Sequence, residues 1–146
     1  MSGGLGIMRS MRFCLCLLMM AAGFLHAADL HGSPPLRGKL HIRQGKATLE
    51  TSDHKMIALE GDEVSNKVLG DDRLNGFEIE ARGHFKSPDH FVIDPSHTHS
   101  LLVRKDGKLK LVTYWCDICS IRAYTPGPCV CCQRETTLDL RDPDDQ

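Results

Sequence analysis

The sequence predicts a mainly β protein, with a small antiparallel barrel followed by a C-terminal cysteine-rich segment. Two observations lead to this fold class. Short runs in which apolar and polar residues alternate recur along the chain, and long stretches of helical periodicity are absent. All cysteines that follow residue 27 lie between Cys116 and Cys132. A barrel is expected because closure removes exposed sheet edges, which promote aggregation.

Residues 1–27 are expected to be a secretory signal peptide rather than part of the fold. Two arginines give a positive start, and 13 apolar residues follow from Phe13 to Leu25, which is the usual length for such a signal. Ala27 and Ala28 supply small residues for cleavage. The run is short for a membrane span, so no stable span is expected after processing. The sequence therefore predicts an exported protein, periplasmic or secreted.

The charge balance argues against a nucleic-acid-binding protein. The sequence holds 18 Lys and Arg residues against 19 Asp and Glu residues, a formal net charge of −1. Loss of the signal peptide removes Arg9 and Arg12 and no acidic residue, so the mature chain is more acidic. Non-specific binding to nucleic acid requires a large positive excess. No nucleic-acid partner is expected, and an exported chain of this kind would meet a protein of the cell envelope as its partner.

Three strands are expected at the start of the barrel, after a proline-containing linker at residues 28–35. Apolar and polar positions alternate strictly over residues 36–43, which predicts a strand with one buried and one solvent-exposed face. Gln44-Gly45 predicts a turn. Residues 47–50 and 56–60 predict two further short strands.

One short helix is expected next. Asp62 is placed to cap it, and Val64 and Val68 recur at helical spacing. The pair Asn75-Gly76 then predicts a turn before the chain returns to strand.

The clearest strand signal covers residues 77–85. Strict alternation predicts that Ile79 and Ala81 point into the core, whereas Glu80 and Arg82 point to solvent.

Three more strands complete the expected sheet. Residues 91–93 predict a short strand, and residues 101–104 and 108–115 flank Asp106-Gly107, a pair typical of a tight hairpin.

This order of elements resembles that of a five-stranded oligonucleotide/oligosaccharide-binding (OB) barrel, with a small sandwich as the alternative. The likeness is one of fold and says little about a ligand. The expected organisation is a β-barrel domain at residues 36–113, a cysteine-rich module that resembles metal-binding modules at residues 114–135, and an acidic tail at residues 136–146.

The cysteines form two pairs with metal-ligand spacing. Cys116 and Cys119 make one C-x2-C pair, Cys129 and Cys132 make another, and nine residues separate the two. Two such knuckles can place four thiolates around one tetrahedral ion such as zinc. The spacer is shorter than is common, and the fifth cysteine, Cys131, remains as an alternative ligand. The sequence thus predicts a structural, zinc-like site made by four cysteines.

Two other interpretations of the cysteines stay open. Export to an oxidising compartment favours disulfides, which would make the segment a stapled interaction domain. The run from Trp115 to Cys119 also resembles the Trp-Cys-x-x-Cys motif of thioredoxin-like enzymes, and suggests a thiol-redox or metal-relay protein of the cell envelope. That motif normally opens a helix within a βαβ unit, and the chain after Cys119 is too short and proline-rich for one. A binding or structural role is therefore favoured over catalysis.

His97 and His99 are a weaker candidate for a second metal site. Residues two apart share a face in a strand, so both imidazoles would reach one ion if the segment were extended. No serine–histidine–aspartate order, glycine-rich phosphate loop or His-Glu-x-x-His motif is present in the sequence. No catalytic residue is therefore assigned.

Residues 113–135 are similar to the tail of small, exported, uncharacterised bacterial proteins. The pattern reads Tyr-Trp-Cys-x-x-Cys, then Pro-Gly-x-Cys-x-Cys-Cys. In that family such a tail follows a barrel-like body, which the preceding residues match more loosely. The resemblance implies a family architecture and no activity.

Overall fold

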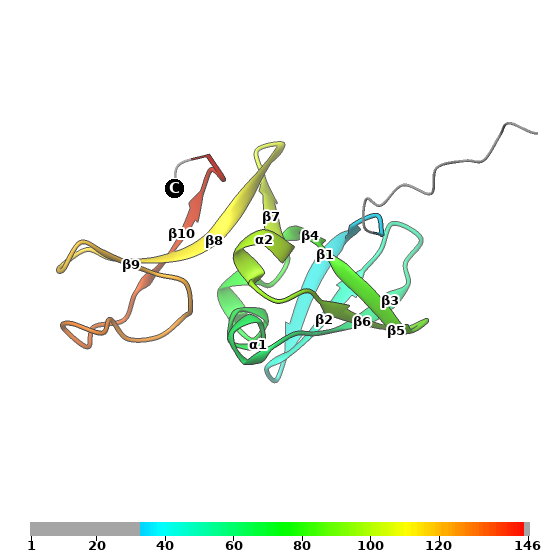
Figure 1. Ribbon diagram of the computed structural model, residues 1–146, viewed down its shortest axis with the longest axis horizontal. Helices are drawn as coiled ribbons and strands as arrows, with labels where there is room; N and C mark the ends of the chain where they lie inside the picture. The colour runs from blue at the N-terminus through cyan, green and yellow to red at the C-terminus, as the bar shows by residue number, and fades with distance from the viewer. Residues whose placement is uncertain (1–32, 145–146) are drawn as a thin grey trace, which may run out of the picture. The chain divides into compact units, whose positions relative to one another are not determined.

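The computed structural model describes residues 33–144, which form one compact unit (Figure 1). The expected signal peptide and most of the expected linker lie outside the described residues. The mainly β class is confirmed, because ten strands join in one sheet beside two short α-helices and one 3-10 turn. None of the helices in the described part is long and apolar enough to cross a membrane.

The first three strands form the expected antiparallel meander. They are β1 (Leu36–Arg43), β2 (Lys46–Glu50) and β3 (Met56–Glu60). Leu40 lies opposite Leu49, and both are fully buried. Gln44 and Gly45 join β1 to β2 with φ angles of 52° and 71°, as a tight hairpin requires.

The expected helix is confirmed as α1 (Glu63–Leu69). The Asp62 carboxylate accepts a hydrogen bond from the backbone N–H of Ser65 and caps the helix. Val68 and Leu69 are buried, which packs the helix on the sheet. The 3-10 turn η1 (Asp72–Leu74) then leads the chain back to the sheet.

The strand expected at residues 77–85 is divided into β4 (Glu78–Ala81) and β5 (Gly83–Ser87). The break falls at Arg82, whose N–H donates to Ser100 and whose carbonyl accepts from Asp94. At the break, a Cβ on Gly83 would collide with the backbone carbonyl of Val92. Beyond the bend Phe85 points outward, and 52% of this residue is exposed.

This bend explains the shape of the barrel. β4 pairs with β1, whereas β5 pairs with β6 (His90–Ile93), which in turn pairs in parallel with β3. The run β1-β2-β3-β6-β5 therefore returns to β4 through Arg82 alone. The hydrogen-bonded path itself is open, with the order β10-β8-β7-β4-β1-β2-β3-β6-β5. The closed barrel expected from the sequence is therefore not formed, and the described strands make one strongly bent open sheet.

The remaining elements extend the sheet from β4. They are α2 (His97–Ser100), β7 (Leu101–Lys105), β8 (Lys108–Cys116), β9 (Ile121–Ala123) and β10 (Thr137–Arg141). The hairpin at Asp106-Gly107 is confirmed, with φ angles of 51° and 76°. β8 carries β9 on one side of its end and β10 on the other (Figure 1). Residues 137–141, placed in the acidic tail by the sequence, thus form an edge strand.

The core confirms the inward positions of β4 and corrects one outward position. Ile79 and Ala81 are buried, and Arg82 is exposed, as predicted. Glu80 is not exposed as expected; only 4% of it is accessible. Side chains of both neighbouring strands reach Glu80: Arg37 Nε of β1 donates to its carboxylate at 2.8 Å, and Arg104 of β7 lies 3.9 Å from it.

We expect Glu80→Ala to lower the free energy of unfolding by about 1–2 kcal/mol, because it removes a buried charge-assisted hydrogen bond. Arg37 stays largely solvated, which limits the loss. Glu78→Ala, which changes an exposed residue on the same face of β4, is the control, with an expected change below about 0.5 kcal/mol. Urea denaturation measures both, and equal effects would contradict the inward position of Glu80.

Candidate metal centre

The first cysteine knuckle is the tip of the β8–β9 hairpin. Cys116 ends β8 and lies opposite Ile121 at the start of β9. The backbone N–H of Ser120 donates to the carbonyl of Cys116 at 2.9 Å, which closes a tight turn over Cys116–Cys119. Ser120 takes a left-handed conformation with φ 53°, which costs a non-glycine residue some strain.

The second knuckle has the same backbone geometry. The N–H of Gln133 donates to the carbonyl of Cys129 at 2.9 Å, and Gln133 is left-handed with φ 60°. A bridge between Pro128 and Glu135 and a hydrogen bond from Cys129 N–H to Arg134 close the loop below it. Two separate segments thus form one type of turn.

Both knuckles also direct backbone N–H groups at their first sulfur. The backbone N–H groups of Cys119 and Ile118 act to lower the pKa of Cys116. Cys129 Sγ accepts from those of Cys132 and Cys131, the latter at 3.5 Å. Such hydrogen bonds stabilise a thiolate, which is the form of cysteine that binds a metal.

The two turns bring four sulfurs together. The Sγ atoms of Cys116, Cys119, Cys129 and Cys132 all lie within 4.8 Å of one another. Cys116 Sγ and Cys132 Sγ are 3.5 Å apart. Four thiolates about 2.3 Å from a tetrahedral ion are separated by about 3.8 Å. The cluster therefore has the size that one metal ion requires, and the predicted convergence of the four cysteines is present.

The thiols of this cluster shift one another's pKa values, so they do not all ionise easily together. The pKa of Cys129 is lowered to about 7 by the backbone N–H groups of Cys132 and Cys131. The pKa of Cys119 is raised well above its usual value, first by its contact with the Cys131 thiol and then by that with Cys132. The backbone N–H of Cys119 lowers the pKa of Cys116, but burial and the neighbouring thiols outweigh this effect, so its pKa is raised overall. Ionising all four thiols together needs a positive charge at their centre.

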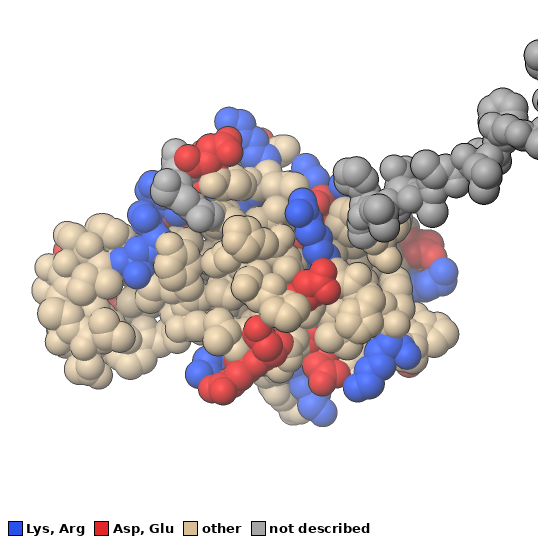
Figure 2. All heavy atoms as spheres, in the orientation of Figure 1, with Lys and Arg blue, Asp and Glu red and all other residues tan. Residues whose placement is uncertain are grey.

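The protein segment itself offers little of that charge. Between Cys116 and Gln133 the charged residues are Asp117 and Arg122. Arg122 points away from the sulfurs, with its guanidinium over the ring of Trp115. Figure 2 shows few charged side chains over the end of the molecule that β9 and the following loop form.

Cys131 stands apart from the four. Cys131 is exposed. By contrast, Cys116 and Cys129 are only 2% exposed, and Cys119 and Cys132 are half-buried. The Cys131 thiol contacts Cys119 but does not reach all of the other sulfurs. All five cysteines of the described residues are free thiols.

The two candidate histidines are not brought to one site. They lie in the helical turn α2 rather than in a strand, so residues two apart point in different directions. His97 is buried, with a pKa lowered by burial and partly restored by Asp62 and by a backbone hydrogen bond to Tyr124. His99 is exposed. The expectation that they share a face is therefore wrong.

Arg73 ties the cysteine segment to the barrel. Its Nη1 donates to the carbonyl of Thr136 at 2.7 Å, and its Nε binds the Asp71 carboxylate at 2.9 Å. Its guanidinium also lies 5.0 Å from the centre of the ring of Tyr114, which is fully buried in the core. The second knuckle is thus attached to η1, and the two knuckles are held by elements that fold with the barrel.

Sequence reasoning missed three residues around the site. Ser120 and Gln133 carry the left-handed turns, and the signal for them is their place directly after the second cysteine of each pair. Arg73 lies 63 residues from its partner Thr136, and no local pattern indicates such a contact.

No family model matches the chain, and neither a curated protein nor a solved structure matches it.

Proposed function

We propose that Cys116, Cys119, Cys129 and Cys132 bind one zinc ion, and that this ion holds the C-terminal segment in its fold. The observation that supports this most strongly is the repeated knuckle, with four sulfurs within 4.8 Å of one another. Thiolate ligands in a tetrahedral set favour zinc over the hard cations magnesium and calcium.

A structural role suits the ligand set better than a catalytic one. Four cysteines fill the coordination of a tetrahedral ion, whereas catalytic zinc keeps one position open for water or substrate. A structural ion would also offset the backbone strain at Ser120 and Gln133, because its bonds to the cysteines would keep both turns in their left-handed form.

The setting that we propose is outside the cytoplasm. The positive start, the apolar run and the small residues of segment 1–27 support export, after which the OB-like barrel and its zinc-bound segment would act as a binding or structural protein of the cell envelope. Expression in a Gram-negative host should then yield a periplasmic or secreted protein shortened by about 27 residues. A full-length protein in the cytoplasm would contradict export.

Cys131→Ser is the prediction that separates the four ligands from the fifth thiol. Because Cys131 is exposed and does not reach all four sulfurs, the variant should bind metal with wild-type stoichiometry. Loading with Co²⁺ in place of zinc gives an absorption spectrum that reports tetrahedral thiolate ligands, and it should match the wild-type spectrum. A loss of that spectrum would make Cys131 a ligand.

A metal-relay role is the second candidate, and the contact between Cys131 and Cys119 favours it. An exposed thiol beside a bound ligand offers a route by which the ion is handed on. In that case Cys131→Ser should keep its metal but slow transfer of zinc to a chelator, whereas a purely structural site should show the same transfer rate in both proteins.

A further inference from the structure

Cys131 is a thiol that the proposed zinc site leaves unused. It lies in the second knuckle between the ligands Cys129 and Cys132, and it is exposed. Its backbone N–H donates to Cys129 Sγ at 3.5 Å, so the turn that would bind the ion also fixes the place of the fifth thiol. A structural ion needs four thiolates. The fifth thiol, which is open to solvent beside them, is available for other chemistry.

The Cys131 thiol meets a ligand of the other knuckle. It contacts Cys119, which is half-buried at the end of the first knuckle. Cys132, the next residue in the chain, has its Sγ within 4.8 Å of Cys119 Sγ. The two knuckles thus bring Cys119 and Cys131 together from separate parts of the sequence. A disulfide between two cysteines requires this kind of proximity.

The contact lies at the uncovered end of the two knuckles. Val130, next to Cys131, is 82% exposed, and Ile118, next to Cys119, is 61% exposed. The rest of the described chain therefore leaves this end accessible. A small oxidant can reach Cys131 without any opening of the fold.

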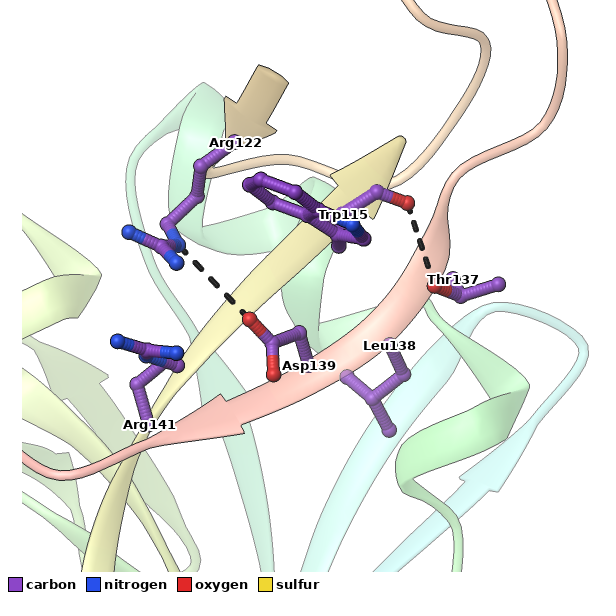
Figure 3. Close-up of a pocket in the computed structure, with 6 residues that line it drawn as sticks. All are labelled: Trp115, Arg122, Thr137, Leu138, Asp139 and Arg141. Atoms are coloured by element: carbon purple, nitrogen blue, oxygen red, sulfur yellow. Dashed lines mark hydrogen bonds and ion pairs between the residues drawn. The ribbon is translucent and has the colours of Figure 1, made fainter. Parts of the chain in front are cut away.

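Side chains of β9 and β10 anchor the base of the first knuckle (Figure 3). The Arg122 guanidinium lies over the ring of Trp115, and its Nε is 3.8 Å from Asp139 Oδ2. Thr137 Oγ1 donates to the Trp115 carbonyl at 3.2 Å. The first knuckle therefore approaches Cys131 from a fixed base, and only its tip has to move when a bond forms there.

Exposure decides which thiol reacts first. Cys116 Sγ and Cys132 Sγ also face each other, at 3.5 Å, but the proposed ion would hold both, and Cys116 is buried. Cys131 is not among the four ligands and is open to solvent. Oxidation favours accessible thiols that stand next to a second, resolving thiol. Cys131 is therefore expected to react first and Cys119 second.

We propose that Cys131 and Cys119 form a peroxide-sensitive switch that releases the ion, an inference that rests on the proposed zinc site. Hydrogen peroxide oxidises the Cys131 thiol to a sulfenic acid and is itself reduced to water. The Cys119 sulfur then leaves the zinc and attacks the sulfenic sulfur. An S–S bond forms, the S–O bond breaks, and the oxygen leaves as hydroxide, which takes a proton from solvent. The two sulfurs lose two electrons in total, and one peroxide becomes two waters.

The new bond would remove one ligand and replace the link that the ion provides. Without Cys119, three thiolates remain for an ion that prefers four, so zinc is expected to leave. The disulfide joins the first knuckle to the second, as the ion did. Oxidation should therefore release zinc while both knuckles stay together, whereas a chelator releases zinc and lets them part. The switch exchanges a metal cross-link for a covalent one.

Peroxide treatment of the reduced, zinc-loaded mature protein tests the proposal. A chromogenic chelator reports the zinc that is released, and the release measured without peroxide is subtracted. We expect about one equivalent of zinc per chain to appear. Mass spectrometry of the product, after its free thiols are blocked, should find a disulfide between Cys119 and Cys131. Dithiothreitol with added zinc should restore the metal content.

Cys131→Ser should slow the peroxide-driven release of zinc by about tenfold or more, because the accessible thiol is gone. Its zinc content before treatment should equal that of the wild type, which shows that the variant is folded around its ion. Val130→Ser is the matched control, since it changes the exposed neighbour of Cys131 and keeps all five thiols. It should release zinc at the wild-type rate.

Equal rates of zinc release in the wild type and in Cys131→Ser would overturn the switch. So would a first disulfide between Cys116 and Cys132 that leaves Cys131 as a free thiol. The zinc site is tested before peroxide is added, since a reduced protein that takes up no zinc would contradict that site and the switch together. A loaded protein that keeps its zinc under peroxide would contradict the switch alone.

Discussion

Cys116→Ser is expected to abolish metal binding and to loosen the chain after Trp115. Cys116 is buried at the end of β8, and its Sγ lies 3.5 Å from Cys132 Sγ. A serine hydroxyl is a harder and more weakly acidic ligand, so three thiolates would remain for an ion that prefers four. Metal analysis should give less than a tenth of the wild-type content as an order of magnitude.

Hydrogen exchange measures the second half of this prediction. In Cys116→Ser, amides between Cys119 and Thr136 should lose protection, because the ion no longer joins the two knuckles. Amides of β1 and β4 should keep theirs, since their core at Leu40 and Ile79 is independent of the cysteines. A chelator should have the same effect on the wild-type protein. Protection that is unchanged after metal loss would contradict a structural role for the ion.

Ile79→Asp is expected to unfold the barrel. Ile79 is 3% exposed and lies opposite Gly38 of β1 and Val103 of β7, in the middle of the sheet. A carboxylate at this position would be buried without a partner, at a cost above about 4 kcal/mol. That is a large share of the stability of a domain of this size. Circular dichroism should show loss of the β spectrum or a strongly reduced urea midpoint.

The conservative change Ile79→Val serves as the control. It keeps an apolar, β-branched side chain in the same place and should cost about 0.5–1.5 kcal/mol. If Ile79→Asp were as mild as Ile79→Val, the inward face of β4 would be assigned wrongly.

Local patterns were sufficient for most of the barrel. Alternation identified β1, the Asp62 cap identified the start of α1, and the glycine-containing pairs identified the two tight hairpins. Each of these depends on residues close in sequence. The sequence also predicted the inward direction of Ile79, since a strand with one buried face alternates strictly.

The errors arise where distant residues decide the outcome. Alternation alone places Glu80 in solvent, but side chains of both neighbouring strands reach its carboxylate, Arg37 from β1 and Arg104 from β7. Nothing near residue 82 shows that β4 must end there to let β5 pair with β6. The sheet is therefore open, whereas a closed barrel was expected.

The candidate site divides in the same way. Cysteine spacing is a local signal, and it identified all four residues of the cluster. The pairing of His97 with His99 failed because it assumed a strand where the chain forms a helical turn. The anchoring of the first knuckle was not predicted, because Arg122 and Asp139 meet across three strands and no sequence motif joins them.

Metal analysis combined with thiol counting on the purified mature protein is the decisive test of a structural zinc ion held by four cysteines. We expect about one equivalent of zinc per chain. We also expect Cys131 alone to react quickly with an alkylating reagent, and the other four thiols to react only after chelation. A protein without metal, in which mass spectrometry finds two disulfide bridges among the five cysteines, would contradict a structural zinc ion and make the segment a disulfide-stapled domain.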